Sequence, residues 1–501
     1  MAHDDEGTGS HAAHKAGGGA LGDNYTVKES GRLRNRHITM ITLGGIIGAS
    51  LFVGSGNIVR SVGPVSILVY LFGGLLVFLA MRMLGEMAAR KPSVGSFMEY
   101  ADQSLGGWAA YLVGWLYWYY WAGIIAYEAS VGGDLLNGWF PALPTWLWSF
   151  LMVLLFVVSN MFSVRMFGEI EFWLASVKVV TIVIFLVIGA LFVLGLWPGS
   201  HFSIPNLWTH GGFAPKGMSP VVMAIATVVF SYFGTEIAVM AAAESVDPAK
   251  GINKATRTVI WRILLFFVGG VFIIVTAVPW DELPKPSDVA PFAYIYGLFG
   301  LPGARLIMEI VLFTAVVSVL NSGLYSAPRM MAALSDKGYA PRLFTRRSRH
   351  GTPIAALFAS CLGALAAVVA KFAVPSDAVF NFIMNSAGLV ALFIYTFIAL
   401  AQWRMRMKLT PEERASLRVR SWFTPVLNIV VIAVVIAVVI IMMFDPESSA
   451  QVWTSLIAAG ALVVAWPFVS RTLRRRGISV EAKMDVERRQ RAVLPDAKSL
   501  S

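Results

Sequence analysis

The stretch GGIIGASLFVGSG, residues 44–56, lies inside the first long apolar run of the chain and decides the fold. It holds five glycines and two serines where an unbroken membrane helix would be apolar. Glycine costs a helix about 1 kcal/mol relative to alanine. Backbone groups freed inside hydrocarbon must find partners in protein, water or a ligand. The stretch therefore predicts a helix that breaks within a membrane.

A second interruption, FSYFGTE at residues 230–236, falls in the sixth apolar run. Paired interruptions in corresponding halves are the best sequence sign of a transporter's binding site. Free N–H groups at the start of a half-helix suit a carboxylate, and free carbonyls at its end suit an ammonium. One break alone would favour close helix packing. The two together favour a site for a zwitterion, the charge pattern of an amino acid.

The composition places the whole chain in a membrane. The 501 residues are 57% hydrophobic and 14% charged, with a mean hydropathy of +0.68. Soluble domains are roughly half apolar and a quarter charged. About twelve runs reach the roughly 20 residues that a bilayer requires. They are 38–59, 64–87, 108–132, 145–164, 170–195, 218–243, 258–279, 303–328, 352–373, 377–402, 422–443 and 450–470.

The net charge of +11 follows the membrane topology. Lysines and arginines gather before the first span and then in alternate loops, as the positive-inside rule requires, so both termini are predicted to be cytoplasmic. Topology and anionic lipid explain this charge better than nucleic acid does. Residues 1–36 lack an apolar core, so no cleavable signal peptide is expected.

Enzyme and cofactor motifs are missing from the sequence. It contains no Walker A loop, no His/Cys metal spacing and no GxSxG elbow. The single cysteine, Cys361, excludes an intramolecular disulfide and a multi-cysteine metal site. We therefore expect no enzyme, no metal and no cofactor. The energy must come from an ion gradient or from the gradient of the substrate itself.

Ionisable residues inside membrane spans cost about 3 kcal/mol each and are site candidates by default. In span three, Tyr117, Trp121 and Glu128 are spaced four and seven apart on one helical face. Such a carboxylate beside aromatic rings suits a substrate ammonium. The alternative is a structural carboxylate between helices, with the rings packed around it.

Lys178 lies about eight residues into span five. A lysine out of water gives up its proton readily, which suits a group that gains and loses a proton in each cycle. The alternative is a snorkelling or permanently paired lysine. Glu169 and Glu171 begin the same span, where an interfacial position is favoured.

Other polar groups at membrane depth lie in spans six, eight and ten. Glu236 either binds a proton or an amine, or braces the broken helix. Glu309 is interpreted as a gate or surface residue near the outer end of span eight. Asn321 and Ser322 in span eight, and Asn385 in span ten, either contact substrate or join helices by hydrogen bonds.

These same residues carry a family resemblance. Residues 44–56, MRMLGEM at 81–87, GEIEFW at 168–173, FSYFGTE followed by AAAESVDP, and LNSGLYSAPRM at 320–330 together resemble the amino acid transporter family of the amino acid/polyamine/organocation superfamily. The resemblance covers residues 30–475. The segments AAAES, TRTVIWRI and VPWDE are most similar to bacterial γ-aminobutyrate (GABA) permeases.

The resemblance implies an all-α polytopic fold like that of the leucine transporter, with two inverted five-helix repeats, two further helices, and helices 1 and 6 broken. It also implies proton-coupled uptake across a bacterial cytoplasmic membrane. The expected divisions are 1–36 as an N-terminal tail, 37–201 and 202–403 as the repeats, 404–472 as helices 11 and 12, and 473–501 as a cytoplasmic tail. The chain beyond about residue 475 is expected to be unstructured.

Position by position, the resemblance assigns roles in binding and coupling. It implies that the substrate carboxylate is bound by Gly48, Ala49 and Ser50, and that the amine side is lined by Phe230, Ser231 and Phe233. Lys178 matches the lysine proposed to couple protonation to transport. The family usually has glycine where this chain has Ser50, so substrate preference does not transfer with the motif.

The sequence thus predicts a secondary active transporter that moves GABA or a related small amino acid inward with a proton. In this hypothesis, protonated Lys178 favours substrate binding, and neutral Lys178 releases the half-helix of span one. The alternatives are aromatic, proline or other neutral amino acids as substrate, sodium as coupling ion, a channel, and a non-transporting sensor.

Overall fold

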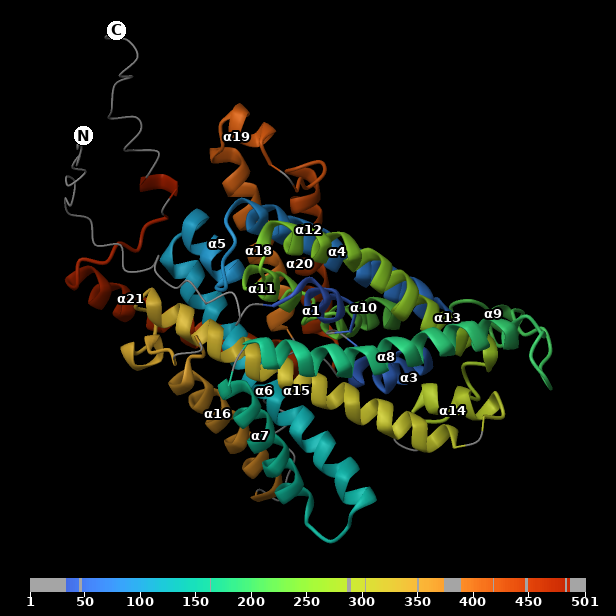
Figure 1. The fold of residues 1–501 in the computed structure, drawn as a ribbon. Helices are drawn as coiled ribbons and strands as arrows, with labels where there is room; N and C mark the ends of the chain where they lie inside the picture. Colours follow the sequence, from blue (N-terminus) through green and yellow to red (C-terminus); the bar gives the residue numbers. More distant parts are fainter. Residues whose placement is uncertain are drawn as a thin grey trace, which may run out of the picture.

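A computed structural model of the chain describes residues 33–44, 47–162, 164–285, 290–301, 303–348, 351–373, 389–417, 419–446, 449–482 and 484–486. These residues form long helices joined by loops and short helices, and their only β-structure is two isolated bridges. The long helices pack side by side around a central region (Figure 1). The chain is an all-α polytopic membrane protein, as predicted.

Both predicted breaks are confirmed. The first span is divided into α1 (Asn35–Gly44), α2 (Ala49–Phe52) and α3 (Gly54–Val62). The sixth is divided into α10 (Ser219–Ser231) and α11 (Ile237–Ala243). Gly234 between them has a φ of 103°, a conformation that glycine adopts far more readily than other residues. In Figure 1, α1, α10 and α11 lie near the centre of the bundle.

The other predicted spans coincide with long helices. They are α4 (Ser66–Arg90), α6 (Gly107–Trp139), α7 (Thr145–Phe162), α8 (Val164–Val193), α12 (Pro248–Arg262) continuing through a π-helical turn (Ile263–Val268) into α13 (Gly269–Ala277), α15 (Ala304–Asp336), α16 (Ile354–Ala373), α18 (Val390–Lys408), α20 (Val426–Phe444) and α21 (Ser449–Arg475). Within the described residues, seven helical stretches are long and apolar enough to cross a membrane. The first part of span ten, 377–388, lies outside the described residues.

Short elements connect the spans. They are the 3₁₀ turns Gly63–Val65 and Arg342–Thr345 and the helices α5 (Ser96–Ser104), α9 (Asn206–Thr209), α14 (Pro291–Leu298) and α19 (Pro411–Ala415). Large apolar side chains remain exposed along α7, α20 and α21, including Leu155, Val430 and Phe468. An exposed apolar face of this extent is what contact with lipid requires.

Small residues set how closely the helices approach one another. A Cβ on Gly323 of α15 would lie 2.8 Å from Ile125 and 2.9 Å from Trp121, both on α6. A Cβ on Gly74 of α4 would lie 2.2 Å from Ile263, directly after α12. Membrane helices pack through such small residues because lipid supplies no hydrophobic drive for their association. Two packed groups result, one of α6 with α15 and one of α4 with α12.

We call the end of the bundle that carries Arg36, Arg90, Lys254, Lys337 and Arg406 the basic end. The chain beyond α21 docks at this end. Gly107 N–H donates to the Val480 carbonyl at 3.0 Å, and Arg404 pairs with Asp485 at 3.1 Å. The expectation that everything after residue 475 is unstructured is therefore wrong for 477–482 and 484–486. Val480 is half-buried and Ala482 is buried, so this segment packs against the protein through apolar residues. Its mixed charge gave no sign of that in the sequence.

Candidate functional site at the helix breaks

Lys178 lies at the first break. Its fully buried ammonium extends from α8 and donates to the carbonyls of Gly44 at 2.7 Å and Ile47 at 2.9 Å. The third bond goes to Ser318 Oγ on α15, at 2.7 Å. An ammonium has three donors, and all three are used. Lys178 thus ties the backbone at the end of α1 to both α8 and α15.

Ser318 extends this contact to a carboxylate. Its Oγ lies 2.5 Å from Oε1 of Glu171, whose side chain is fully buried on α8. The interfacial interpretation is therefore wrong for Glu171. Helix α8 begins at Val164, before the predicted start at 170, so Glu171 is two turns inside it. Glu169 remains at the edge, 32% exposed, where it pairs with Arg36 at 2.5 Å.

The predicted carboxylate-binding stretch lies between α1 and α15. A Cβ on Gly48 would meet Val319 Cγ2 at 3.0 Å, so glycine permits the close approach of this stretch to α15. Ser50 is half-buried in α2. Ala49 begins α2, but its side chain lies outside the described residues. At the break, Ile47 N–H donates to the Gly44 carbonyl at 3.0 Å and the Gly48 carbonyl accepts from Leu51 N–H at 3.2 Å. A carboxylate would therefore bind the N–H groups at the start of α2.

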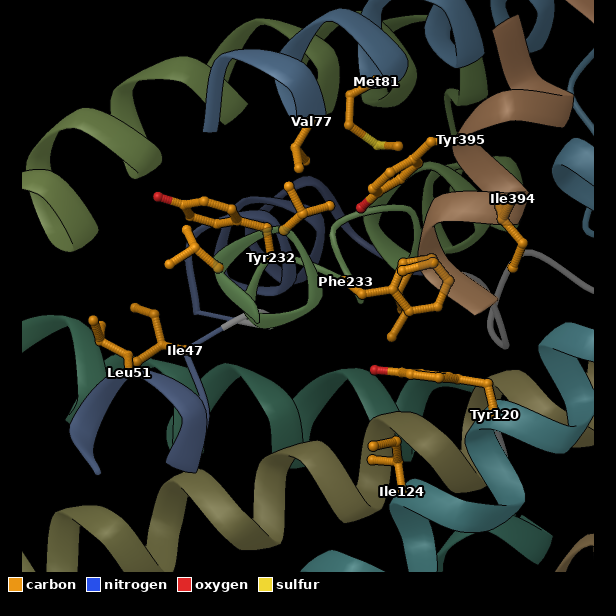
Figure 2. Close-up of a cluster of buried hydrophobic side chains, with 14 of the residues drawn as sticks. Ile47, Leu51, Val77, Met81, Tyr120, Ile124, Tyr232, Phe233, Ile394 and Tyr395 are labelled. Atoms are coloured by element: carbon orange, nitrogen blue, oxygen red, sulfur yellow. The ribbon is translucent and has the colours of Figure 1, made fainter. Parts of the chain in front are cut away.

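Aromatic rings surround the second break. Phe233 packs against Tyr120 with ring centroids 4.5 Å apart, and against Tyr395 at 5.8 Å (Figure 2). Ser231 ends α10, and its hydroxyl donates to the Thr227 carbonyl of the same helix at 3.1 Å. Phe230 belongs to α10, with its side chain outside the described residues. Of these three predicted residues, Phe233 is the one whose side chain is seen to reach the ring cluster.

Glu236 braces the second break. Its Oε1 accepts from the Tyr117 hydroxyl at 3.1 Å, and its Oε2 accepts from Gly234 N–H at 2.9 Å. The carboxylate is fully buried. Tyr117 is thereby joined to Glu236 and also packs against Phe233, with ring centroids 5.9 Å apart. This geometry corresponds to the bracing alternative, and it leaves Tyr117 and Glu236 satisfied within the protein.

Four other predicted site residues carry buried polar atoms with no hydrogen-bond partner in the described parts of the chain. These atoms are Trp121 Nε1, Glu128 Oε2, Asn321 Nδ2 and Ser322 Oγ. An unsatisfied buried polar group costs about 1–3 kcal/mol. Two of these side chains still have polar neighbours, since Trp121 acts on Tyr117 and Asn321 acts on Glu171. Asn321 Oδ1 is already used, because it accepts from Asn160 Nδ2 at 3.0 Å. Asn385 lies outside the described residues.

The basic end is closed by polar contacts. Glu244, just after α11, pairs with Arg329 of α15 at 2.9 Å and accepts from the Tyr325 hydroxyl at 2.9 Å. Leu33 forms a parallel bridge with Ser245, and its carbonyl accepts from Val246 N–H at 3.2 Å. These contacts join the chain before α1 and the end of α11 to α15.

Sequence reasoning missed several of these residues. Tyr120 and Tyr395 lie in aromatic or apolar runs that do not distinguish a site from packing. Ser318 has no local signal, since its role depends on α8 lying beside it. Glu171 had one, because it is seven residues from Lys178 and therefore on the same helical face. Among the described residues, no three His, Cys, Asp or Glu side chains gather as a metal site.

Comparison with known proteins places this geometry in a family. The family model described as amino acid permease matches residues 37–471. The chain belongs to the amino acid permease family. It is 39% identical to a γ-aminobutyric acid permease of Bacillus subtilis, covering 92% of this chain and 98% of the relative. It is 41% identical to a γ-aminobutyric acid permease of Escherichia coli, covering 88% and 94%.

Two further similarities bear on substrate range and fold. An aromatic amino acid transport protein of Corynebacterium glutamicum is 35% identical, with 86% of the permease and 93% of the relative covered. A crystal structure of an Eremococcus coleocola manganese transporter matches with a TM-score of 0.51 at 12% identity, covering 87% and 92%. At that identity the match concerns the fold alone. The permease is thus an amino acid transporter and not an enzyme, and its fold is the predicted leucine-transporter-like one.

Proposed function

We propose that the permease takes up GABA or a related small amino acid together with a proton, by alternating access. The observation that carries this proposal is the buried ammonium of Lys178, which donates to the carbonyls of Gly44 and Ile47 at the first break. A cation that can lose its charge occupies the place where a coupling ion would hold the broken helix. The identity to γ-aminobutyric acid permeases supports the substrate.

The substrate carboxylate would bind the backbone around Gly48–Ser50, and its amine would face Phe233 and Glu128. In the described chain, Oε2 of Glu128 on α6 has no hydrogen-bond partner, which supports Glu128 as the residue that binds the substrate ammonium. The rings of Phe233, Tyr120 and Tyr395 fill the space beside the second break. That crowding favours a slender substrate over an aromatic one. Aromatic amino acids remain the second candidate, supported by the Corynebacterium glutamicum relative.

The orientation follows from charge. By the positive-inside rule we expect the basic end to face the cytoplasm of a bacterial cell, and both termini to be cytoplasmic. The repeats would span 37–201 and 202–403, with 404–472 as the two additional helices. The Glu244–Arg329 pair then closes the cytoplasmic side.

Uptake of labelled GABA into proteoliposomes under an imposed pH gradient tests the proposal. We expect accumulation when the outside is acidic, and its loss when a protonophore collapses the gradient. An inward sodium gradient without a pH gradient should drive none. Unlabelled GABA should compete better than phenylalanine, proline or lysine. Absence of competition by GABA contradicts the substrate, and accumulation driven by sodium alone contradicts the coupling ion.

A further inference from the structure

The hydrogen-bonded chain from Lys178 does not end at the helix break. Lys178 Nζ donates to Ser318 Oγ at 2.7 Å, and Ser318 Oγ lies 2.5 Å from Glu171 Oε1. All three side chains are fully buried. A hydroxyl has one donor and two acceptor sites, so Ser318 accepts from the lysine and donates to the carboxylate. Every bond in this chain runs from Lys178 toward Glu171.

From this geometry we propose that Glu171 is the acceptor of the coupling proton and that Ser318 relays it from Lys178. The proposal rests on the proton coupling proposed above and adds the residue that takes the proton. In the step, one N–H bond of the ammonium breaks as an O–H bond forms on Ser318. The original Ser318 proton moves to Glu171 Oε1. A positive and a negative group become a neutral amine and a neutral carboxylic acid.

The transfer changes how α1 is held. Before it, three charge-assisted bonds hold Gly44, Ile47 and Ser318. After it, the amine keeps two N–H donors for the carbonyls, and its lone pair accepts from the Ser318 hydroxyl. Hydrogen bonds between neutral groups are roughly half as strong as those with an ionised partner. The backbone of α1 is therefore loosened by the step that removes the proton.

The position of Glu171 gives the step a direction. It lies seven residues from Lys178 along α8, or about 10 Å at 1.5 Å per residue. Glu169 lies two residues farther toward the basic end, partly exposed and paired with Arg36 and His37 of α1. The other charged group that acts on Lys178 is Glu128 of α6. A proton on Glu171 is thus closer to the basic end than one on Lys178.

Glu171 is also not fully satisfied as it stands. Its Oε2 is buried, and the neighbouring Asn321 side chain acts on the carboxylate, but no hydrogen bond of normal geometry reaches Oε2 in the described chain. A carboxylate kept only to balance the charge of Lys178 would be expected to have both oxygens satisfied. An unsatisfied carboxylate becomes less costly to bury once it is protonated. The site thus favours a proton that arrives from Ser318.

The test uses the full-length permease in proteoliposomes, with the variants Glu171→Gln, Ser318→Ala and Ser318→Thr. Two readouts are taken, accumulation of labelled GABA under a pH gradient and exchange at equal pH. We expect Glu171→Gln and Ser318→Ala to lose accumulation by about a hundredfold, the scale of a positioned proton transfer, while exchange stays near wild type. Ser318→Thr keeps the hydroxyl and should retain accumulation.

Matched controls isolate the relay. Thr314→Val removes a hydroxyl of α15 that bonds only to the Val311 carbonyl of its own helix, and it should change neither readout. Asp336→Asn removes an exposed carboxylate at the end of the same helix that pairs with Arg347, and it should leave coupling intact. If Glu171→Gln is not recovered as folded protein, the comparison of Ser318→Ala with Ser318→Thr decides, because Glu171 stays in place in both.

Undiminished accumulation in Ser318→Ala overturns the relay, since a carboxylate that only balances charge needs no hydroxyl. Equal losses of accumulation and exchange overturn it too, because they indicate damage to substrate binding. These failures differ from a failure of the proposed function. In that case the wild type itself shows no accumulation driven by a pH gradient, and the relay falls together with proton coupling.

Discussion

Two regions of the permease bury carboxylates, and they treat them differently. At the basic end, Glu86 of α4 is fully buried with both oxygens occupied: Oε1 by Arg406 at 2.8 Å and Gln402 at 3.0 Å, Oε2 by the backbone N–H of Ser421 and a second Arg406 contact. Around Lys178, Glu171 and Glu128 each keep one buried oxygen without a hydrogen bond within the described chain, whereas Glu236 at the second break has both oxygens bonded, as Glu86 does.

The difference separates two uses of an intramembrane charge. A carboxylate whose two oxygens are both hydrogen-bonded stabilises the fold in that position. Moving or protonating it would break those hydrogen bonds. A partly satisfied carboxylate is held less firmly and gains from a proton or an ammonium. We therefore infer that Glu86 fixes α4 to α18, whereas the carboxylates near Lys178 take part in transport. The predictions below test that division.

The largest effect is expected from Lys178→Ala. The change removes the cation that holds Gly44, Ile47 and Ser318, so accumulation driven by a pH gradient should be abolished. Exchange of labelled GABA at equal pH should remain detectable, because the proposed substrate contacts are untouched. Uptake into proteoliposomes measures both. Lys285→Ala, at an exposed loop position, is the control and should transport like wild type. Uphill uptake by Lys178→Ala at the wild-type level would refute the coupling role.

Gly48→Val should come next, since it fills the space between the first break and α15. A Cβ here already meets Val319 at 3.0 Å, and valine adds two methyl groups. Overpacking of this kind costs about 1–3 kcal/mol, which corresponds to a loss of roughly tenfold to a hundredfold in substrate affinity. Equilibrium binding of labelled GABA measures it. Gly54→Val is the matched control and should bind GABA like wild type, because a Cβ at Gly54 meets nothing within 4 Å. Wild-type affinity in Gly48→Val would place the carboxylate elsewhere.

Glu86→Ala tests the other side of the comparison. It leaves Arg406, Gln402 and the Ser421 N–H without their shared acceptor, and breaking a buried pair in this way costs about 3 kcal/mol of folding stability. Thermal unfolding in detergent should show the loss, while coupling per folded molecule stays at the wild-type value. Glu282→Ala, at an exposed position, should leave the unfolding temperature unchanged. A stable Glu86→Ala permease with lost proton coupling would reverse the assignment of the two regions.

How far the sequence predicts these regions depends on where the partners come from. The breaks follow from local glycines, so both were predicted. Glu236 was recognised, but only the fold shows that Tyr117 and Gly234 N–H satisfy it. Glu86 was not singled out, because its partners are more than 300 residues away on α18 and the following loop. The helical periodicity of the sequence predicts which face of a helix a residue occupies. It does not predict whether the neighbouring helix supplies a hydrogen-bond donor to that residue.

The smallest effect is expected from Lys337→Met, in an ion-pair cluster outside the membrane spans. Lys337 follows α15 and pairs with Glu99 at 3.0 Å and Asp102 at 2.7 Å, both on α5. Burial alone would raise the pKa of Glu99, but the Lys337 ammonium, with smaller contributions from Gln103 and Lys91, outweighs burial and holds that pKa below its ordinary value. Burial likewise opposes the charge of Lys337, but Glu99 and Asp102 raise its pKa above the ordinary value.

The signs of these shifts define a pH window for the cluster. A lowered pKa of Glu99 contributes stability above its unfolded-state pKa, and this is lost as the pH falls through the lowered value. A raised pKa of Lys337 contributes stability that is lost only as the pH rises through that raised value. Lys337→Met should therefore lower the unfolding free energy by about 1 kcal/mol near neutral pH, and by less in acid. Thermal unfolding between acid and neutral pH measures this, with exposed Lys285→Met as the control. A loss of stability that does not change with pH would assign the effect to packing of the lysine side chain instead of its charge.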